Sequence, residues 1–598
     1  MIKLNETFGF LAIQSENMDQ TTDLLSNIKE FCSSLPHVYI QQVNLPGFCL
    51  IYWSRNPYPR EIDNSDDKYE PANSKHTFLI GNLHEPAPQD SNNNNAWSGL
   101  NGRYAWLQWQ QHSKILTATS DFLGIRPLYY LHADKALLIS NEIFPLVESG
   151  YTRNKINPTG YVQMLEKGYC LGSNTLHNDI KWLPPGSSLV SSNRSIKVTN
   201  KTYLMRGHSQ CKENSYDAMA DQLYELLLAS TTKRTNNKAH SILLSGGLDS
   251  RVVGGLLQKL DLISDTFTWH QGTGGDLVAA KEIAKALGVH PKFITIPHDH
   301  LQKHHEELIK LDGGATNAHI TYLLAALHSF NGTLPPLAIG YAGDPLTGAH
   351  IPYRTHLGSL HPSIEESVEH FDSALGRFFK DDELLSILRK PEWKDAIGSS
   401  REEIKKTMLA AQTNSHFNRW TAALLWNRNL RCTTFLPRLC DNFTPTFSPF
   451  EDKTVYEYCL SLPFDALNNQ LVYRKMVGRH FKKLAKIPRS NGEQVCSEIE
   501  LSARYRYTAL AAKLAPKPLR QRISRWGGGG YAIDPNADLR IGSTQYLKQI
   551  LKQDDRWGEF LDPKKVSSLI NNHLDSKTKQ GLQIQALVTV LESLSTRK

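Results

Sequence analysis

Residues 241–250 read Ser-Ile-Leu-Leu-Ser-Gly-Gly-Leu-Asp-Ser, a short apolar run that ends in two glycines. A second apolar stretch with helical spacing follows, from Val252 through Leu257. This order predicts a buried strand, a tight turn and the start of a helix, where free backbone N–H groups and the helix dipole receive an anion. Gly246 and Gly247 let the backbone approach phosphate oxygens that a Cβ would exclude. The stretch therefore predicts a phosphate-binding loop.

The predicted loop also carries polar side chains suited to a nucleotide. Ser245 and Ser250 add hydroxyl donors, and Asp249 is expected to hold a divalent ion against the phosphate oxygens. The residues expected to bind the nucleotide in this stretch are Leu244, Ser245, Gly246, Gly247, Leu248, Asp249 and Ser250. The Gly-Lys-Ser/Thr sequence of a Walker loop does not occur in the chain, which disfavours transfer of the γ-phosphoryl group.

Strands and helices alternate after the loop. Thr266–Trp269 and Phe293–Ile296 have the pattern of strands, and Asp276–Leu287 between them has the pattern of an amphipathic helix. This alternation predicts a parallel sheet with phosphate bound at the carboxyl edge of its strands. From about residue 360 to the end the chain is predicted to be mainly helical, interrupted by a mobile loop at Trp526–Gly530.

The first 200 residues have a different pattern of apolar and polar residues. Short alternating runs at Thr77–Ile80, Tyr104–Trp109 and Lys135–Ser140, separated by turn residues, predict a β-rich domain. Residues 89–95 are expected to form a polar loop, and the polar stretch 193–214 is expected to be a linker. The predicted division is therefore a first domain at 1–200 and a second at 215–598.

Composition limits the class of protein. A length of 598 residues predicts several domains, and 40% hydrophobic and 9% aromatic residues are typical of a soluble globular protein. No apolar run is long enough for a membrane span, and the N-terminus lacks a secretory apolar segment. The cysteines lack any Cys-x-x-Cys pair, which favours reduced thiols in a cytoplasmic protein; they are Cys32, Cys49, Cys170, Cys211, Cys432, Cys440, Cys459 and Cys496. A net charge of +8 is weak evidence for a nucleic-acid partner, and none is expected.

Several motifs occur together in order. Residues 120–130 read Ser-Asp-Phe-Leu-Gly-Ile-Arg-Pro-Leu-Tyr-Tyr, residues 140–143 read Ser-Asn-Glu-Ile, and residues 183–186 read Leu-Pro-Pro-Gly. With the 245–250 loop, which is similar to the pyrophosphate loop of the N-type ATP pyrophosphatases, the chain resembles the asparagine synthetase family over nearly its whole length. The resemblance implies an α/β and α+β protein of two domains. The first would be a degenerate glutaminase with an Ntn-hydrolase-like β-sandwich, and the second an adenine-nucleotide α-hydrolase-like parallel sheet with a helical C-terminal portion.

The first domain departs from the chemistry that the resemblance implies. Active members of the family use a cysteine at residue 2, whose free α-amine serves as its base. This chain has Ile2 there, and an alternative alignment on Phe8-Gly-Phe-Leu-Ala places Phe8 at the nucleophile position. Cys32 and Cys49 cannot carry a free α-amine, and the family's Asn-Gly-Glu substrate segment is reduced to Gly81–Leu83. The first domain is therefore predicted to lack glutaminase activity.

The second domain keeps the family's signatures. Residues 273–280 resemble the segment in which Ser-x-Asp precedes an Ala-rich helix, and residues 339–348 align with the family's Ser-Gly-Glu-Gly-Ser-Asp-Glu loop. That alignment places Asp344 on the second magnesium-binding acid beside Asp249, and the resemblance adds Thr268 and Gly340 to the nucleotide site. Downstream, residues 437–441 and 448–452 resemble its Asp-Arg and Pro-Phe-Leu-Asp segments. ATP and Mg²⁺ are the implied cofactors.

One departure in the 339–348 loop bears on the amine substrate. Tyr341 replaces the glutamate of true asparagine synthetases, and Gly-Tyr-x-x-Asp resembles relatives that close rings, such as the β-lactam synthetases. The resemblance thus implies a catalytic role for Tyr341, as a group that assists proton removal from the attacking amine. A cation for the tetrahedral oxyanion is expected near residues 485–491, and alignment does not decide between Lys486 and Arg489.

Three classes of function remain open at this point. The first is an adenylating ligase that joins a carboxylate to an amine, in its sharpest versions a macrolactam or β-lactam type cyclase. The second is an amidotransferase that makes a primary amide on aspartate or a uronic-acid sugar with ammonia supplied from elsewhere, and the third is a non-catalytic scaffold. The expected partners are a small-molecule or peptide carboxylate and a possible protein that delivers it; the oligomeric state is left open. The basic run from Lys513 to Arg525 is expected to be a solvated helix face.

Overall fold

The computed structural model describes most of the chain and all of the nucleotide-site residues expected from the sequence. The residues outside this description are 5–6, 16–20, 33–34, 36–37, 56–59, 63–74, 89–93, 98, 134–135, 153–154, 193–194, 200–210, 273–274, 331–333, 351–362, 412, 414–415, 491–492, 496–532 and 596–598. The predicted mobile loop at Trp526–Gly530, the basic run from Lys513 to Arg525, Cys496 and most of the polar loop at 89–95 lie outside the described residues.

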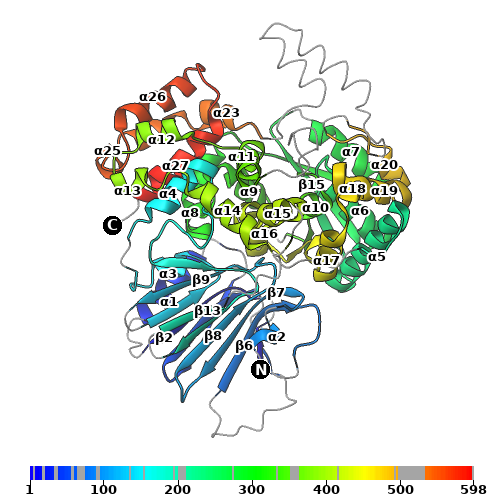
Figure 1. Cartoon of the computed structure of the whole chain (residues 1–598), viewed down its shortest axis with the longest axis horizontal. Coiled ribbons are helices and arrows are strands. Elements are labelled where there is room, and N and C mark those ends of the chain that lie inside the picture. Colours follow the sequence, from blue (N-terminus) through cyan, green and yellow to red (C-terminus); the bar gives the residue numbers. More distant parts are fainter. Residues whose placement is uncertain are drawn as a thin grey trace.

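Two sheets form the N-terminal part of the molecule, shown in blue and cyan in Figure 1. One has the order β13 (Ser195–Thr199), β12 (Ser188–Ser192), β8 (Ile115–Ser120), β7 (Gly102–Gln110), β6 (Lys75–Leu83), β1 (Ile2–Leu4) and β5 (Arg60–Ile62). The other has the order β11 (Ile180–Leu183), β9 (Leu128–Ala133), β10 (Ala136–Ser140), β2 (Thr7–Ser15), β4 (Phe48–Ser54) and β3 (Tyr39–Leu45). Inward-facing residues of both sheets, such as Phe10, Phe48 and Leu107, share one buried cluster, as in a β-sandwich.

The three strands predicted in this region are confirmed as parts of β6, β7 and β10. The predicted linker at 193–214 is wrong at its start, because Ser195–Thr199 forms β13 and pairs antiparallel with β12. Its alternate residues are exposed at the edge of the sheet, so its polar composition resembled a linker.

A third sheet carries the alternating pattern that the sequence predicted after residue 240. Its five strands are all parallel and have the order β16 (Pro291–Thr295), β15 (Ile263–His270), β14 (His240–Leu243), β17 (Leu337–Ala338) and β18 (Thr446–Phe447). The apolar run before the glycines is β14, which pairs with β15 on one side and with β17 on the other. The helices predicted after it are α6 (Leu248–Lys259) and α7 (Gly275–Leu287).

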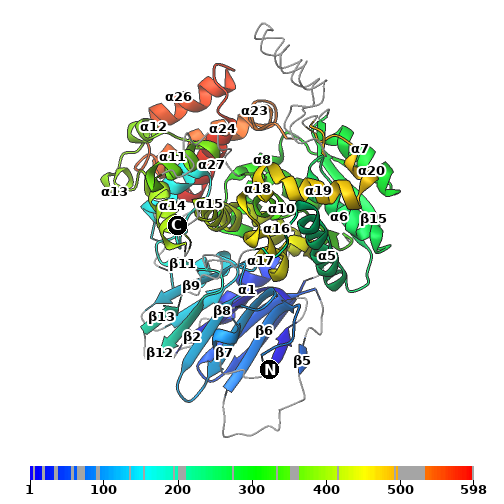
Figure 2. The ribbon, with the colours of Figure 1, turned by 45° about the vertical axis from the view of Figure 1, so that its right-hand side comes forward.

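Helices surround this sheet and fill the C-terminal part of the chain, as predicted (Figure 2). They include α5 (Tyr216–Thr235), α8 (His300–Asp312), α9 (Thr321–His328), α10 (Gly343–Thr347), the π-helical segment η3 (Leu424–Thr433), α16 (Phe435–Phe443), the short turn η4 (Pro449–Glu451), α17 (Lys453–Ser461), α19 (Leu471–His480) and α20 (Lys482–Ala485). The outer group includes α11 (Ile364–Ala374), α12 (Asp381–Ile387), α13 (Pro391–Lys394), α14 (Ser399–Ala410), α24 (Thr544–Leu551), α26 (Pro563–Leu574) and α27 (Gly581–Ser595).

The N-terminal and C-terminal parts of the chain are not separated as simply as the predicted domain boundary implies. Helix α4 (Pro158–Lys167) lies within the predicted first domain, yet it packs against the yellow-green α13 and α14 and the red α27 of Figure 1. Its buried Tyr161 hydroxyl lies 2.8 Å from the Ser593 hydroxyl of α27. The stretch after β10 thus joins the sandwich to the helical layer.

Charged residues also join the two parts, and they come from segments that resembled family motifs. The Arg103 guanidinium at the start of β7 donates to both Glu451 carboxylate oxygens, at 2.7 and 2.6 Å, and to Asp441 at 2.8 Å. Nearby, Asp452 accepts hydrogen bonds from Asn101 and Arg234. The acids of the 437–441 and 448–452 motifs therefore hold the sandwich against the edge of the parallel sheet.

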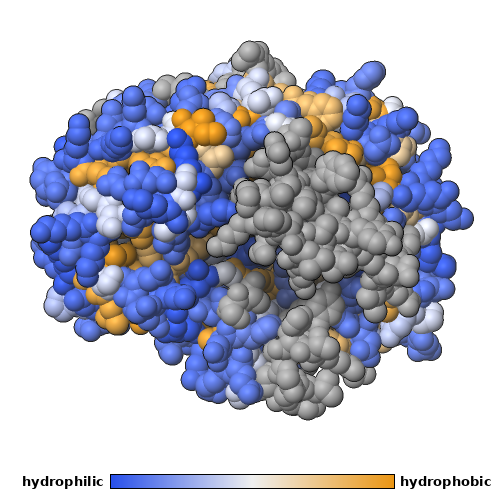
Figure 3. All heavy atoms as spheres, turned by 90° about the horizontal axis from the view of Figure 1, so that it is seen from above, coloured by the Kyte–Doolittle hydropathy of each residue, from blue (hydrophilic) through white to orange (hydrophobic). Residues whose placement is uncertain are grey.

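The face seen in Figure 3 is mostly hydrophilic, with hydrophobic residues in scattered groups. Within the described part of the chain, no helix combines the length and the apolar character that crossing a bilayer requires.

Candidate active site

The loop after β14 has the geometry that the glycines predicted. Gly247 caps the N-terminus of α6 in an extended conformation, so the helix begins at Leu248 with Asp249 in its first turn. The Ser250 hydroxyl accepts from the Ser245 amide at 3.1 Å, and the Gly247 amide donates to the Ser245 hydroxyl at 3.2 Å. These hydrogen bonds within the loop fix its conformation. The concave side of the loop lies at the N-terminus of a helix, where an anion is stabilised.

Neighbouring segments pack tightly on this loop. A Cβ on Gly246 would lie 2.7 Å from the Ser490 Cβ and 2.9 Å from an Asp276 oxygen, so only glycine fits. The Gly246 amide donates to Asp276, in the first turn of α7, at 2.9 Å. The remaining predicted nucleotide residues support the loop from behind: the Thr268 hydroxyl donates to the Leu244 carbonyl at 2.7 Å, and the Leu248 side chain lies in the core.

Asp249 and Asp344 meet as the sequence predicted, although 95 positions separate them. The Asp344 amide donates to the Asp249 carboxylate at 2.7 Å, and Asp344 lies in the first turn of α10. The approach requires glycines, since a Cβ on Gly343 would lie 2.3 Å from the Asp249 carboxyl carbon and one on Gly340 would lie 2.6 Å from its Cβ. Between them, Ala342 has a positive φ of 68°, which an L-residue adopts at some cost.

The electrostatics of this acid pair suit a divalent cation. Burial, and then the charge of Asp344, raise the pKa of Asp249 well above its ordinary value. Hydrogen bonds from the Tyr473 hydroxyl and the Asp344 amide, and the charge of Arg489, act in the opposite direction. Two carboxylates held this close repel one another unless a proton or a cation lies between them. Carboxylate oxygens are the ligands that Mg²⁺ prefers, so the residues present fit the cofactor that the sequence implied.

Three side chains of the site were missed by the sequence reasoning. The Tyr473 hydroxyl on α19 donates to Asp249 at 3.0 Å, and the Gln470 amide donates to Asp344 at 3.3 Å and to the Thr347 hydroxyl at 2.8 Å. Tyr473 lies on α19 and Gln470 directly precedes that helix, each more than 120 residues further along the chain, so no local pattern indicated them. The third, Arg251, directly follows the motif and is a charged residue at the start of an otherwise apolar helix, which is a signal that could have been read.

Arg251 connects the loop to the segment that carries the candidate cations. Its side chain is fully buried, and its guanidinium donates to the carbonyls of Gly246 at 3.3 Å, Leu484 at 3.0 Å and Pro488 at 3.2 Å, and also to that of Ile487. The Ser490 amide in turn donates to the Gly246 carbonyl at 3.3 Å. Residues 484–490 are thereby fixed against the phosphate-binding loop.

The two candidate cations of that segment have different surroundings. Lys486 follows α20 and is exposed, whereas Arg489 is partly buried, with 22% of its side chain accessible, and pairs with Glu493 at 3.4 Å. Glu493 also accepts from Arg474 at 2.8 Å, so it is held in place for Arg489. The charge of Arg489 lowers the pKa of Asp249 against the effect of burial, so the electrostatics favour Arg489 as the cation that acts on the acid pair.

Replacing each of these two residues with alanine should show which one is required for the reaction. Arg489→Ala is expected to lower the rate of amide formation by about 10²–10³-fold, the effect of removing one donor from a site of developing negative charge, while carboxylate-dependent ATP–pyrophosphate exchange stays near the wild-type rate. Lys486→Ala is the matched control on the same segment and should stay within a few-fold of the wild type. The opposite ranking would assign the role to Lys486.

Tyr341 does not lie where its predicted role would place it. Its side chain is buried in the core, and its hydroxyl accepts from the Asn429 side-chain amide at 3.0 Å. Burial, and then the charges of Glu451 and Tyr456, raise its pKa well above the ordinary value. A phenol with a raised pKa is a poor proton acceptor, so the geometry does not support the role of base, which stays a prediction of the sequence.

Tyr341→Phe tests this point. The variant is expected to keep both pyrophosphate exchange and amide formation within about threefold of the wild type, because one buried hydrogen bond contributes about 1 kcal/mol to stability. The two rates should be measured side by side, with the unfolding midpoint. A selective loss of about 10²–10⁴-fold in amide formation alone would instead support the base assigned from the sequence.

The sandwich offers no thiol nucleophile at either position that the sequence comparison singled out. Phe8 lies buried in β2 with the Arg55 guanidinium 4.5 Å from the centre of its ring, and Ile2 lies in β1. Burial and the charge of Glu142 raise the pKa of the Cys32 thiol to about 12. Burial also raises the pKa of Cys49, against a hydrogen bond from Gln42. Protonated, buried thiols are inert as nucleophiles.

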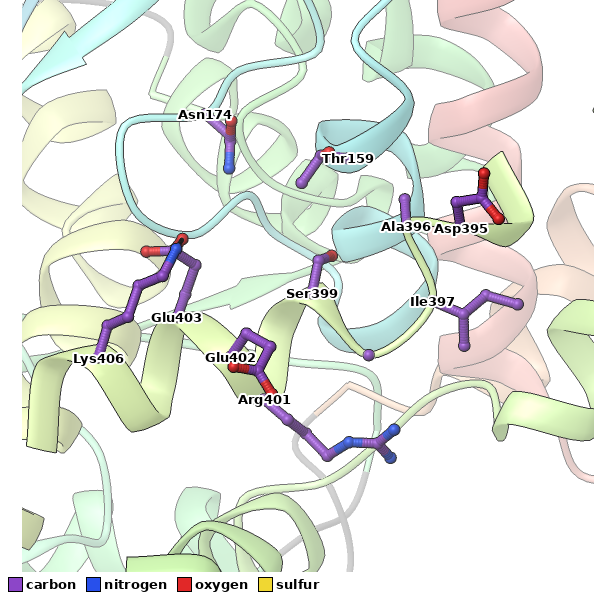
Figure 4. Close-up of a pocket in the computed structure, with 11 residues that line it drawn as sticks. Thr159, Asn174, Asp395, Ala396, Ile397, Ser399, Arg401, Glu402, Glu403 and Lys406 are labelled. Atoms are coloured by element: carbon purple, nitrogen blue, oxygen red, sulfur yellow. Dashed lines mark hydrogen bonds and ion pairs between the residues drawn. The ribbon is translucent and has the colours of Figure 1, made fainter. Parts of the chain in front are cut away.

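The described cysteines are unpaired, and one cavity lies away from this site. All seven cysteines in the described part of the chain are free, as predicted from their scattered spacing. A cavity of about 560 Å³ opens where α4 meets α14, and Figure 4 shows acidic and basic side chains around it. Its lining includes Arg401, Glu402, Glu403 and Lys406 but none of the predicted site residues.

A parallel sheet whose carboxyl edge carries an anion-binding loop and an acid pair defines a domain suited to a nucleotide with a divalent cation. The asparagine synthase family model matches residues 222–428, which contain this loop and both acids, and a glutamine amidotransferase domain model matches residues 92–204. With both domains present in this order, the chain belongs to the asparagine synthetase family.

Individual relatives are distant. Asparagine synthetase [glutamine-hydrolyzing] 1 of Bacillus subtilis is 24% identical over 197 residues, covering 32% of this chain and 31% of that protein. A putative asparagine synthetase [glutamine-hydrolyzing] 1 of Methanocaldococcus jannaschii is 26% identical over 32% of this chain and 33% of its own length. Amidase chry2 of Gibberella zeae is 23% identical over 35% and 34%. The matches thus span about one third of these curated relatives.

Among solved structures, glutamine phosphoribosylpyrophosphate amidotransferase from B. subtilis aligns with 48% of this chain and 65% of its own, at 10% identity and a TM-score of 0.22. A score this low carries no argument about the fold.

Proposed function

We propose that this protein is an ATP-dependent carbon–nitrogen ligase that activates a substrate carboxylate as an acyl-adenylate, with release of pyrophosphate, and lets an amine displace AMP. The observation that carries the proposal is the contact between Asp249 and Asp344 beside the loop of residues 245–250, at the carboxyl edge of a parallel sheet. The second domain is accordingly proposed to be of the adenine-nucleotide α-hydrolase-like type.

The residues of the site divide the work of adenylation. Backbone amides of the loop and the N-terminus of α6 would hold the pyrophosphate portion of ATP, while Asp249 and Asp344 would hold Mg²⁺. The bound cation supplies neutralisation of the charge that develops on the leaving pyrophosphate. Arg489 would stabilise the negative charge on the carbonyl oxygen when the amine attacks. Arg251 holds the loop and the segment that carries Arg489 in a fixed position relative to each other. The groups that stabilise the charge on pyrophosphate and the charge on the carbonyl oxygen therefore need no rearrangement between the two steps.

We further propose that the amine belongs to a substrate and does not come from glutamine. The support is the buried Phe8 and the raised pKa values of Cys32 and Cys49, which leave the described part of the sandwich without a reactive thiol. The finer form of the proposal is ring closure of the macrolactam or β-lactam type on a small-molecule or peptide acid, with a possible partner protein that delivers it. An amidotransferase that takes free ammonia is the alternative outcome.

Purified protein is expected to release no glutamate from glutamine above a protein-free control, with or without ATP, because an acyl-enzyme cannot form without a thiolate. The measurement is an enzyme-coupled glutamate assay. Cys32→Ala and Cys49→Ala serve as controls for a cryptic thiol. Glutamine hydrolysis that one of these variants abolishes would overturn the proposal for the sandwich.

The source of the amine can be tested with the full-length protein. Acids that support ATP–pyrophosphate exchange should first be found among aspartate, uronic acids and acidic peptides. The best acid is then incubated with ATP and either ammonium or no added amine, and its mass is measured. Loss of the mass of water without added amine supports ring closure, whereas product that forms only with ammonium supports the amidotransferase.

A further inference from the structure

Two histidines and a glutamate meet on the pair of helices α8 and α9. His304 Nδ1 lies 3.2 Å from one Glu307 carboxylate oxygen, and His328 Nε2 lies 2.7 Å from the other. One ligand atom from each of the three side chains lies within 4.8 Å of the other two. None of the three belongs to the acid pair, to the 245–250 loop or to the segment that carries Arg489.

These side chains form the donor set of a transition-metal site. Two imidazole nitrogens and one carboxylate oxygen are the protein ligands of many four-coordinate zinc sites, in which water fills the remaining position. Imidazole suits Zn²⁺, Cu²⁺, Ni²⁺ and Fe²⁺, whereas Mg²⁺ and Ca²⁺ prefer oxygen ligands throughout. The chemistry therefore selects a cation different from the one expected at Asp249 and Asp344.

The three side chains of the site are partly accessible to solvent. The accessible fractions of the three side chains are 18% for His304, 21% for Glu307 and 34% for His328, so solvent reaches the fourth position. The two imidazole rings lie nearly parallel, 5.2 Å apart between centroids. Binding requires one ring to turn so that both lone pairs point at one centre. His328, the last residue of α9, is the more exposed of the two histidines, and its ring lies edge-on to Phe443 with 5.1 Å between centroids.

The helices that carry the site precede, in the sequence, the strand that supports Asp344. His304 and Glu307 lie one turn apart on α8, and β17 is the next strand of the sequence after α9. Strand β17 pairs with β14 and precedes the loop of Gly340 and Asp344. A metal that joins α8 to α9 would thus brace the chain just before the catalytic loop.

We propose that His304, Glu307 and His328 form a binding site for a divalent transition metal of the zinc class, which clamps α8 to α9. The site is separate from the nucleotide site and does not depend on the proposed function. Its role is structural, since none of the nucleotide-site residues contributes a ligand to it.

The test uses full-length protein without a polyhistidine tag, freed of metal with a chelator and held in excess Mg²⁺ so that oxygen-only sites are occupied. Co²⁺ is titrated in while its visible absorption and the heat of binding are recorded, and Zn²⁺ is then added to displace it. One equivalent of Co²⁺ is expected to bind with the absorption of a four-coordinate site, and Zn²⁺ should raise the unfolding midpoint of the wild type.

The variants decide whether these three residues are the ligands. Glu307→Gln and His328→Ala, which lie on different helices, should each weaken Co²⁺ binding at least tenfold, while circular dichroism shows that they remain folded. His112→Ala, an exposed histidine of the sandwich, and Asp249→Asn should bind as the wild type does. Absence of one-to-one Co²⁺ binding by the wild type would overturn the proposal. So would Co²⁺ binding by Glu307→Gln and His328→Ala that is as tight as binding by the wild type.

Discussion

Asp249→Asn is expected to lower the rate of carboxylate-dependent ATP–pyrophosphate exchange by about 10³-fold or more, because the cation loses an anionic ligand where charge develops. The loss should not reflect unfolding. The raised pKa of Asp249 means that the folded protein binds this proton more tightly than the unfolded chain, so its ionisation makes stability fall as pH rises above 3.8. Without Mg²⁺, the asparagine variant should therefore melt at the same temperature as the wild type or higher, and its advantage should grow from pH 5 to pH 8.

Asp261→Asn is the matched control, since this exposed aspartate lies just beyond the other end of α6. It should change neither the exchange rate nor the melting temperature. Exchange by Asp249→Asn at more than a tenth of the wild-type rate would contradict the role of this acid. A melting temperature that falls with activity would show that the carboxylate is required for the fold.

The second large effect is expected at Arg251. Replacing it with methionine leaves the carbonyls of Gly246, Leu484, Ile487 and Pro488 without the buried guanidinium that bonds them. Burying unpaired polar groups of this kind should cost on the order of 3–5 kcal/mol of stability. In the fraction that remains folded, kcat should fall more than the KM for ATP rises, because the loop persists while the Arg489 segment loses its position.

Unfolding in denaturant and steady-state kinetics measure the two consequences separately. Lys259→Met removes a cation from the exposed end of the same helix and should alter neither. Arg251→Lys should recover part of the stability, since an ammonium reaches fewer of the carbonyls than the guanidinium fork. If Arg251→Met is as stable and as active as Lys259→Met, the connection between the loop and residues 484–490 has no functional importance.

The predictable part of the site lies in local patterns. The apolar run, the two glycines and the amphipathic helix were read from consecutive residues, and the structure places them as β14, the loop and α6. Asp344 was found because a loop motif surrounds it. Tyr473 and Gln470 could not be found in this way, since α19 and the residue before it reach the acid pair from far along the chain.

Orientation was the part that sequence patterns did not specify. A tyrosine in the loop of residues 339–348 can face the acid pair or the core, and the backbone between Gly340 and the positive φ of Ala342 turns Tyr341 toward Asn429. The His304 and Glu307 spacing is visible in the sequence, but the third ligand, His328, depends on how α8 packs against α9. The segments that match family motifs at 437–441 and 448–452 were recognised, although their contact with Arg103 was not.

The most direct test of adenylation is the identity of the nucleotide released during turnover. With an acid that the enzyme activates, its amine and α-³²P-labelled ATP, chromatography should show AMP formed in step with amide and pyrophosphate, and no ADP. In parallel assays, Asp249→Asn should form little AMP. Asp261→Asn should form as much AMP as the wild type. ADP and orthophosphate as the products would contradict the account, because the bond broken would then be that of the γ-phosphate.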